Sequence, residues 1–129
     1  MIVLDACVLI AHLDGNDAHH ARATRLLADL TGHPKITSVL TRAEILVAAA
    51  RAGRRRAVED ILDQLHVDTD ELPSEAAGQL AELRAHTGLR MPDCCVLLTA
   101  ERTGADVATF DARLARAAAE RGLVVRSGT

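Results

Sequence analysis

The sequence predicts an α/β fold, a three-layer α/β/α arrangement around a central, mainly parallel sheet of four to five strands. Short apolar, β-branched runs alternate along the chain with longer segments of helical periodicity. No repeat, low-complexity tract or linker divides the 129 residues. Because this length suits one hydrophobic core, we expect a single domain over residues 1–129.

The first strand is expected in the run MIVLD, which is apolar enough for a buried parallel strand. The following ACVLIAHL is expected to turn into a short helix. Residues 17–30 place alanines and leucines along one helical face, and Gly32 follows as a stop. The run KITS is the second strand candidate.

Two helices are then expected in succession. Residues 41–53 are rich in alanine and end at a glycine, and residues 55–65 carry apolar side chains at the spacing of a core-facing side. HVDT is expected to form a brief strand. A further helix is predicted over residues 74–86, ended by Gly88.

The last part of the chain repeats this alternation. Pro92 suits the first turn of a helix over residues 92–104, which a glycine closes. DVAT is expected to be a strand, residues 111–122 a helix, and LVVRS a final strand. In open sheets of this kind, sites lie beyond the carboxyl ends of the strands.

Composition excludes several classes of protein. With 49% apolar and 26% charged residues the chain is globular, and no stretch approaches the roughly 20 apolar residues that span a bilayer. The N-terminus lacks a basic leader, so we expect a cytoplasmic protein. Three cysteines, Cys7, Cys94 and Cys95, form neither a disulfide framework nor a zinc spacing and suit a reducing compartment. The six histidines show no helical zinc pattern either.

Four carboxylates stand at the starts of helices or the ends of strands. Asp5 follows the first strand inside an apolar run, where an ionised group needs a partner or a cation. Asp111 suits a helix N-cap, Asp93 the first turn of a helix, and Glu44 a capping box with Thr41. Each of these last three residues has a purely structural interpretation when taken alone.

Their joint placement predicts a metal site. Asp5 and Asp111 both end buried strands, and Glu44 and Asp93 both begin apolar helices, so all four can face one crevice. Because close carboxylates repel one another, such a cluster is unfavourable without a cation. A set of oxygen ligands suits Mg²⁺ or Mn²⁺, which share their coordination with substrate phosphates. The pattern predicts phosphodiester hydrolysis by a metal-activated water.

With these four residues in place, the chain resembles a PIN domain, and within that family the VapC toxins of type II toxin-antitoxin pairs. The resemblance covers nearly the whole chain and is carried by IVLDACVLI, TSVLTRAEILVAAAR and LRMPDCCVLLTAERTGADVATFDARLARAA. It implies a PIN-like fold and a Mg²⁺- or Mn²⁺-dependent endoribonuclease that cleaves RNA. It also implies inhibition by a cognate antitoxin protein and assembly into a homodimer.

Carried over by position, the resemblance makes Asp5, Glu44, Asp93 and Asp111 the catalytic, metal-binding cluster. Thr109 matches a frequent threonine of the family and is expected to help position a ligand or phosphate. At Cys7 the chain departs from the family, which often has Ser, Thr or Asn there, and a thiol is a weaker hydrogen-bonding group.

Arginines supply the only local basic run, although the net charge of the chain is −3. Such a run is usually a solvated turn, and contact with RNA phosphates is the alternative function of the four residues in RAGRRR: Arg51, Arg54, Arg55 and Arg56. Phe110 is the single aromatic residue, so stacking platforms for bases are scarce.

Two other functions fit parts of the pattern. A phosphatase of the haloacid dehalogenase type also uses an Asp after the first strand but usually needs a second Asp two residues later, where this chain has Cys7. A non-catalytic PIN-like module that binds RNA or protein is the alternative that stays open. Cleavage of RNA in the presence of Mg²⁺ or Mn²⁺ distinguishes the enzyme from the module.

Overall fold

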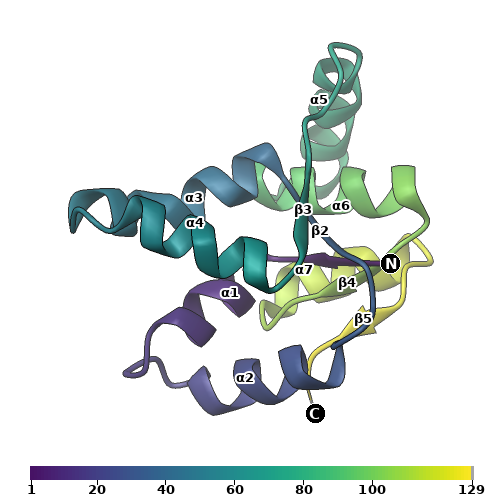
Figure 1. Ribbon diagram of the computed structural model, residues 1–129. Coiled ribbons are helices and arrows are strands. Elements are labelled where there is room, and N and C mark those ends of the chain that lie inside the picture. Colours follow the sequence, from purple (N-terminus) through teal and green to yellow (C-terminus); the bar gives the residue numbers. More distant parts are fainter. Residues whose placement is uncertain (129) are drawn as a thin grey trace.

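The computed structural model describes residues 1–128, which fold around one five-stranded sheet (Figure 1). The strands are β1 (Ile2–Leu4), β2 (Lys35–Ser38), β3 (Val67–Asp70), β4 (Asp106–Ala108) and β5 (Val125–Arg126). Their order across the sheet is β3-β2-β1-β4-β5, and every neighbouring pair is parallel. The predicted α/β class and parallel sheet are therefore confirmed, with the first strand at the centre.

Seven helices connect the strands of the described chain. They are α1 (Ala6–Leu13), α2 (His20–Asp29), α3 (Val39–Arg51), α4 (Arg55–Gln64), α5 (Ala76–Thr87), α6 (Met91–Thr103) and α7 (Ala112–Glu120). Each predicted helix is present, and its bounds differ from the prediction by a few residues. Residues 1–128 contain no helix with the length and apolar content needed to cross a membrane.

The sheet separates two hydrophobic cores. Ile2 and Leu4 of β1 pack with α1, α2, α3 and α4, whereas Val3 between them packs with α5, α6 and α7. Successive side chains of a strand point to opposite faces, so one short apolar run serves both cores. In Figure 1, α3 and α4 extend together to one side of the sheet and α5 projects on its own. This is the three-layer arrangement predicted from the sequence.

The start of α3 differs from the capping-box interpretation. Ser38 is the N-cap, and its Oγ accepts a hydrogen bond from the backbone N–H of Thr41 at 3.1 Å. Thr41 is therefore inside the first turn, and Glu44 lies almost a turn further along the helix. A capping box between Thr41 and Glu44 was wrong because the helix begins earlier, directly after β2. The carboxylate of Glu44 has no capping role.

A half-buried acid that the sequence did not single out connects the edge strand β3 to α6. Asp70 ends β3 and accepts hydrogen bonds from Thr99 Oγ1 at 2.9 Å and from Arg102 Nη1 at 2.8 Å. Burial alone would raise the pKa of Asp70, but hydrogen bonds from Arg102, the Leu72 backbone N–H and Thr99 outweigh burial and lower the pKa. Asp70 is therefore a structural carboxylate, because both of its oxygens accept hydrogen bonds from the protein.

Replacing Asp70 should weaken this connection in a pH-dependent way. Because folding lowers the pKa of Asp70, its ionised form stabilises the fold at neutral pH and loses that effect as the pH falls below about 4. We expect Asp70→Asn to lower the free energy of unfolding by about 1–3 kcal/mol at pH 7. Urea unfolding at pH 7 and pH 3.5 should show the difference from the parent shrinking in acid. Asp68→Asn, on the exposed face of the same strand, is the control. An equal loss at both pH values would contradict this assignment.

Candidate active site

The site lies at the carboxyl edge of the two central strands, β1 and β4. Leu4 of β1 pairs with Ala108 of β4, and the backbone N–H of Asp5 donates to the Ala108 carbonyl oxygen at 2.9 Å. This register brings Asp5 beside Thr109, although 104 positions separate the two residues in sequence. The parallel sheet therefore joins the first and the last of the predicted acidic blocks.

The carboxylate of Asp5 is buried and held from one side. Its Oδ2 accepts hydrogen bonds from Thr109 Oγ1 at 2.7 Å and from Cys7 Sγ at 3.1 Å, and the residue is 8% exposed. No donor within residues 1–128 hydrogen-bonds its Oδ1. Asp5 also precedes α1 but makes no side-chain cap for it. One oxygen is thus fixed and the other is left for a ligand.

Thr109 links Asp5 to Asp111. Besides donating to Asp5, Thr109 Oγ1 accepts the backbone N–H of Asp111 at 3.0 Å. Asp111 caps α7, since its Oδ1 accepts the N–H groups of Arg113 at 2.8 Å and Leu114 at 3.1 Å. The N-cap interpretation of Asp111 is confirmed, and the cap uses a single carboxylate oxygen. The other oxygen of Asp111 has no hydrogen-bond donor in the described chain.

Glu44 and Asp93 approach the same edge from helices α3 and α6. Asp93 stands in the first turn of α6, as the sequence predicted, and is 8% exposed. Burial raises the pKa of Asp93, the charges of Asp5 and Asp111 raise it further, and Arg90 and Arg113 oppose them. Burial likewise raises the pKa of Glu44, Arg90 lowers it, and Asp5 and Asp93 add to the increase.

These mutual effects place the four predicted acids in one electrostatic neighbourhood. Glu44 and Asp93, whose pKa values the neighbouring carboxylates raise, are disfavoured as free anions, and a divalent cation removes that penalty. Within residues 1–128 no three His, Cys, Asp or Glu side chains converge into a preformed metal cage. Mg²⁺ needs no such cage, because it usually binds through one or two carboxylates and keeps several waters. The donor set, all oxygen and all acidic, fits Mg²⁺ or Mn²⁺.

Cys7 takes the supporting position beside Asp5. Its thiol donates to Asp5 Oδ2, lies 3.7 Å from Thr109 Oγ1 and accepts the Phe110 N–H at 3.5 Å. Burial and the charge of Asp5 raise the pKa of Cys7 to about 12, so the sulfur remains a protonated donor at neutral pH. The thiol makes the contact that a hydroxyl or amide would make at this position, with a weaker donor.

Two arginines next to the acids were not singled out from the sequence. Arg90 Nε lies 3.9 Å from Asp93 Oδ2, and the charge of Arg113 lowers the pKa of Asp93. Arg90 was detectable from helical spacing, since it lies three residues before Asp93, whereas no spacing in the sequence relates Arg113 to Asp93. The candidate site therefore combines four acids with two bases at its rim.

The four arginines of RAGRRR are exposed and lie at the turn between α3 and α4. Arg51 ends α3 seven residues after Glu44, about 10 Å along the helix axis. Arg55 pairs with Glu59 at 2.5 Å, one helical turn away. A role in RNA binding stays a prediction for Arg51, Arg54, Arg55 and Arg56.

Thr109 offers a test of the network around Asp5. Thr109→Val keeps the shape but removes both the donor to Asp5 and the acceptor of the Asp111 N–H. Since losing a supporting partner of a metal ligand costs about 10- to 100-fold, we expect metal-dependent phosphodiester cleavage to fall by that factor. Initial cleavage rates measure it. Thr109→Ser keeps the hydroxyl and should retain most of the rate; equal rates for both variants would argue against a positioning role.

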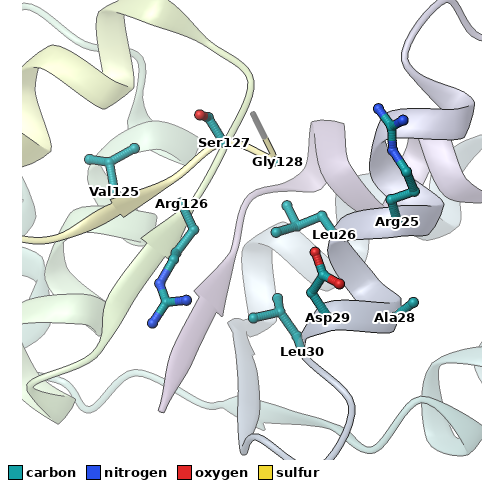
Figure 2. A pocket seen from close by; sticks show the side chains of 9 residues that line it. All are labelled: Arg25, Leu26, Ala28, Asp29, Leu30, Val125, Arg126, Ser127 and Gly128. Atoms are coloured by element: carbon teal, nitrogen blue, oxygen red, sulfur yellow. The ribbon is translucent and has the colours of Figure 1, made fainter.

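A separate cavity of about 500 Å³ lies between α2 and β5 and contains none of the four acids. Figure 2 shows Leu26 of α2 and Leu30, which follows the end of that helix, facing Arg126 across it. The guanidinium of Arg126 donates to Asp106 Oδ2 at 3.1 Å. The cavity lies beside β5, which is the edge strand of the sheet next to β4.

The comparison with known families agrees with the fold. The PIN domain model matches residues 2–120, and the chain therefore belongs to the PIN domain family. The resemblance to VapC toxins within that family is confirmed by a curated relative, Ribonuclease VapC46 of Mycobacterium tuberculosis (strain ATCC 25618 / H37Rv). The two chains are 37% identical over 105 residues, which cover 74% of this chain and 75% of the relative.

Solved structures share the same fold at lower sequence identity. VapC20 of Mycobacterium tuberculosis, described as a toxin that cleaves the sarcin-ricin loop, superposes with a TM-score of 0.78 at 19% identity, covering 91% of this chain and 95% of that one. A toxin-antitoxin complex from Klebsiella pneumoniae gives 0.76 at 20% identity, covering 100% and 98%. FitAB bound to a DNA fragment gives 0.75 at 20%, covering 99% and 95%.

Proposed function

We propose that this protein is a Mg²⁺- or Mn²⁺-dependent endoribonuclease that hydrolyses RNA phosphodiester bonds and acts as the toxin of a toxin-antitoxin pair. The observation that carries the proposal is the convergence of Asp5, Glu44, Asp93 and Asp111 on one edge of the sheet, where burial and mutual repulsion raise the pKa of Glu44 and Asp93. The likeness to a protein named a ribonuclease supports the choice of RNA as substrate.

The acids and the arginines have different roles in the proposed reaction. Asp5 offers a fixed carboxylate, held by Thr109 and Cys7, and Asp93 offers a second one beside it. A divalent cation bound there supplies water activation and offsets the negative charge of the phosphate. Arg90 and Arg113 stand at the rim, where they attract the phosphate that four carboxylates alone would repel.

Cleavage of RNA by the purified protein tests this proposal. A 5′-labelled cellular RNA pool is incubated with the protein and Mg²⁺, Mn²⁺ or EDTA, and the new 5′ ends are sequenced. We expect cleavage with either cation and none with EDTA. RNA binding without cleavage under all three conditions would instead support the non-catalytic module and overturn the enzymatic assignment.

An antitoxin is the protein partner that we propose. It is supported by the toxin-antitoxin complexes among the structures with the same fold. An apolar cavity of about 340 Å³ between α1, α3 and α4 is the kind of surface into which an amphipathic partner helix packs, and its lining includes Ile10, Leu13, Ile45, Val58 and Ile61. Co-expression with the product of a neighbouring small open reading frame should yield a complex that does not cleave RNA.

The proposed homodimer is supported by exposed apolar side chains on α3. Val39, Leu40 and Val47 are 47%, 36% and 45% exposed and follow one side of the helix. If this surface joins two copies, Val47→Asp should convert a dimer into a monomer without loss of helix content. Light scattering after size exclusion measures the mass, and circular dichroism measures the helix content. A parent protein that is monomeric at high micromolar concentration would exclude the dimer.

A further inference from the structure

A group of basic side chains continues from the acidic cluster along α7. We define the α7 basic strip by Arg90 at the start of α6, Arg113 and Arg116 on α7, and His86 at the end of α5. All four side chains are exposed. They come from three separate stretches of the chain, so no basic run in the sequence marks them.

The strip borders a cavity of about 470 Å³ between the end of α5 and α7. Its lining includes His86, Arg113, Arg116 and Arg121, and Glu120 is the one acid on it within the described residues. The surface is therefore mainly basic in a chain whose net charge is −3. Such a local excess of positive charge attracts an anion that the whole molecule does not.

Two arginines of the strip form no ion pair in the described part of the chain. Arg121 forms an ion pair with Glu101, and His86 lies 3.6 Å from Glu82. Neither Arg113 nor Arg116 makes an ion pair within residues 1–128. Their guanidinium groups remain available for an external anion.

The strip starts at the acids and leads away from them. Arg90 lies 3.9 Å from Asp93, and the backbone N–H of Arg113 donates to Asp111. Arg116 follows Arg113 on the same helical face, about 4.5 Å further along the axis of α7. A polyanion whose reacting group sits at the acids would therefore meet Arg113 first and Arg116 next.

We propose that the α7 basic strip binds the sugar-phosphate backbone of single-stranded RNA on one side of the cleaved bond, an inference that rests on the proposed ribonuclease function. Arginine forks match phosphate oxygens in charge and geometry. Apart from the imidazole of His86, the strip carries no aromatic side chain for stacking, so it holds the sugar-phosphate backbone through its arginines. It positions the chain so that one phosphodiester lies over the acids.

The salt dependence of RNA binding tests this assignment. Binding of a fluorescein-labelled single-stranded RNA pool is measured in Mg²⁺ with protein that carries Asp5→Asn, to prevent cleavage. The slope of log K against log salt is negative, and each lost phosphate contact reduces its magnitude by about 0.7. In this protein, Arg113→Gln with Arg116→Gln should reduce the magnitude of the slope by about 1.4 and the affinity about tenfold at 0.15 M salt. The same pair changed to lysine should retain the slope.

The pair Arg54→Gln and Arg56→Gln is the matched comparison, since it removes the same charge from the exposed turn between α3 and α4. We expect it to change the slope less than the α7 pair does. A drop confined to the α3–α4 pair would place the RNA on that turn and overturn the proposal. Loss of antitoxin binding with unchanged RNA binding would overturn it as well.

Failure of this inference is separable from failure of the proposed function. If the parent protein neither binds nor cleaves RNA, the ribonuclease assignment is wrong. If the parent cleaves RNA and the α7 pair leaves affinity and slope unchanged, the assignment of the strip alone is wrong. A Mg²⁺-induced rise in melting temperature equal to that of the parent shows that the α7 variant keeps its fold and its acids.

Discussion

Asp5→Asn should abolish Mg²⁺-dependent cleavage of RNA while the protein remains folded. The change removes the anionic charge of the oxygen that has no protein donor and keeps an oxygen for Thr109 to donate to. Removing a supporting partner of a metal ligand already costs about 10- to 100-fold, so loss of a ligand charge should reduce the rate by about 100-fold or more. Initial rates of cleavage, measured with Mg²⁺ in excess, give this factor.

The matched control for Asp5→Asn is Asp60→Asn. Asp60 is exposed on α4 and lies outside the acidic cluster, so the same chemical change there should leave the cleavage rate unaltered. Circular dichroism and thermal unfolding establish that both variants fold. A folded Asp5→Asn protein that cleaves RNA as fast as the parent would remove Asp5 from the reaction, whatever the other three acids do.

The sequence was informative about the fold because its strands are buried on both faces. A run such as IVL is apolar throughout, and such runs alternate with helices whose ends carry Gly88 and Gly104. Gly104 adopts φ 69°, in the left-handed region where glycine is favoured, and it turns the chain from α6 into β4. Local chemistry therefore fixes the order of the elements, and the parallel class follows from that order.

The details of the site were less predictable because they depend on contacts between distant residues. Cys7 looks like a small apolar residue in sequence, and only the pairing of β1 with β4 brings its thiol to Asp5 and Thr109. Asp70 also ends a strand, as Asp5 does, but its partners Thr99 and Arg102 come from α6. The same residue type after a strand is thus structural in one place and a candidate ligand in another.

The positions of the arginines relative to the acids were also hard to predict from the sequence. RAGRRR is conspicuous because four arginines are consecutive or nearly so, yet its position at the α3–α4 turn is remote along the helix from Glu44. Arg113 and Arg116 are separated by other residue types and attract no notice in the sequence. The position of α7 after Asp111 brings Arg113 to the rim of the acids, and helical spacing places Arg116 next to Arg113 on the same face.

Asp93 carries the second large prediction, in which the sign of a stability change depends on metal. Burial and the charges of Asp5 and Asp111 raise the pKa of Asp93 above its usual value. For a carboxyl group this means that the ionised form opposes folding when the pH is above the folded-state pKa, and that the cost disappears as the pH falls through it. In the absence of metal, the functional charge of Asp93 therefore destabilises the protein at neutral pH.

We expect Asp93→Asn to unfold at a higher urea concentration than the parent in EDTA at pH 7. The difference between the two unfolding midpoints should decrease toward acidic pH. In Mg²⁺ the order should reverse, because a cation at about 100 times its Kd stabilises the parent by about 2.7 kcal/mol and the variant binds it more weakly. Asp60→Asn should follow the parent under both conditions. Two results would contradict this prediction: Asp93→Asn less stable than the parent in EDTA, or a gain in stability from Mg²⁺ as large as that of the parent. In either case Asp93 would be a structural residue of α6 and the metal would be held by the other acids.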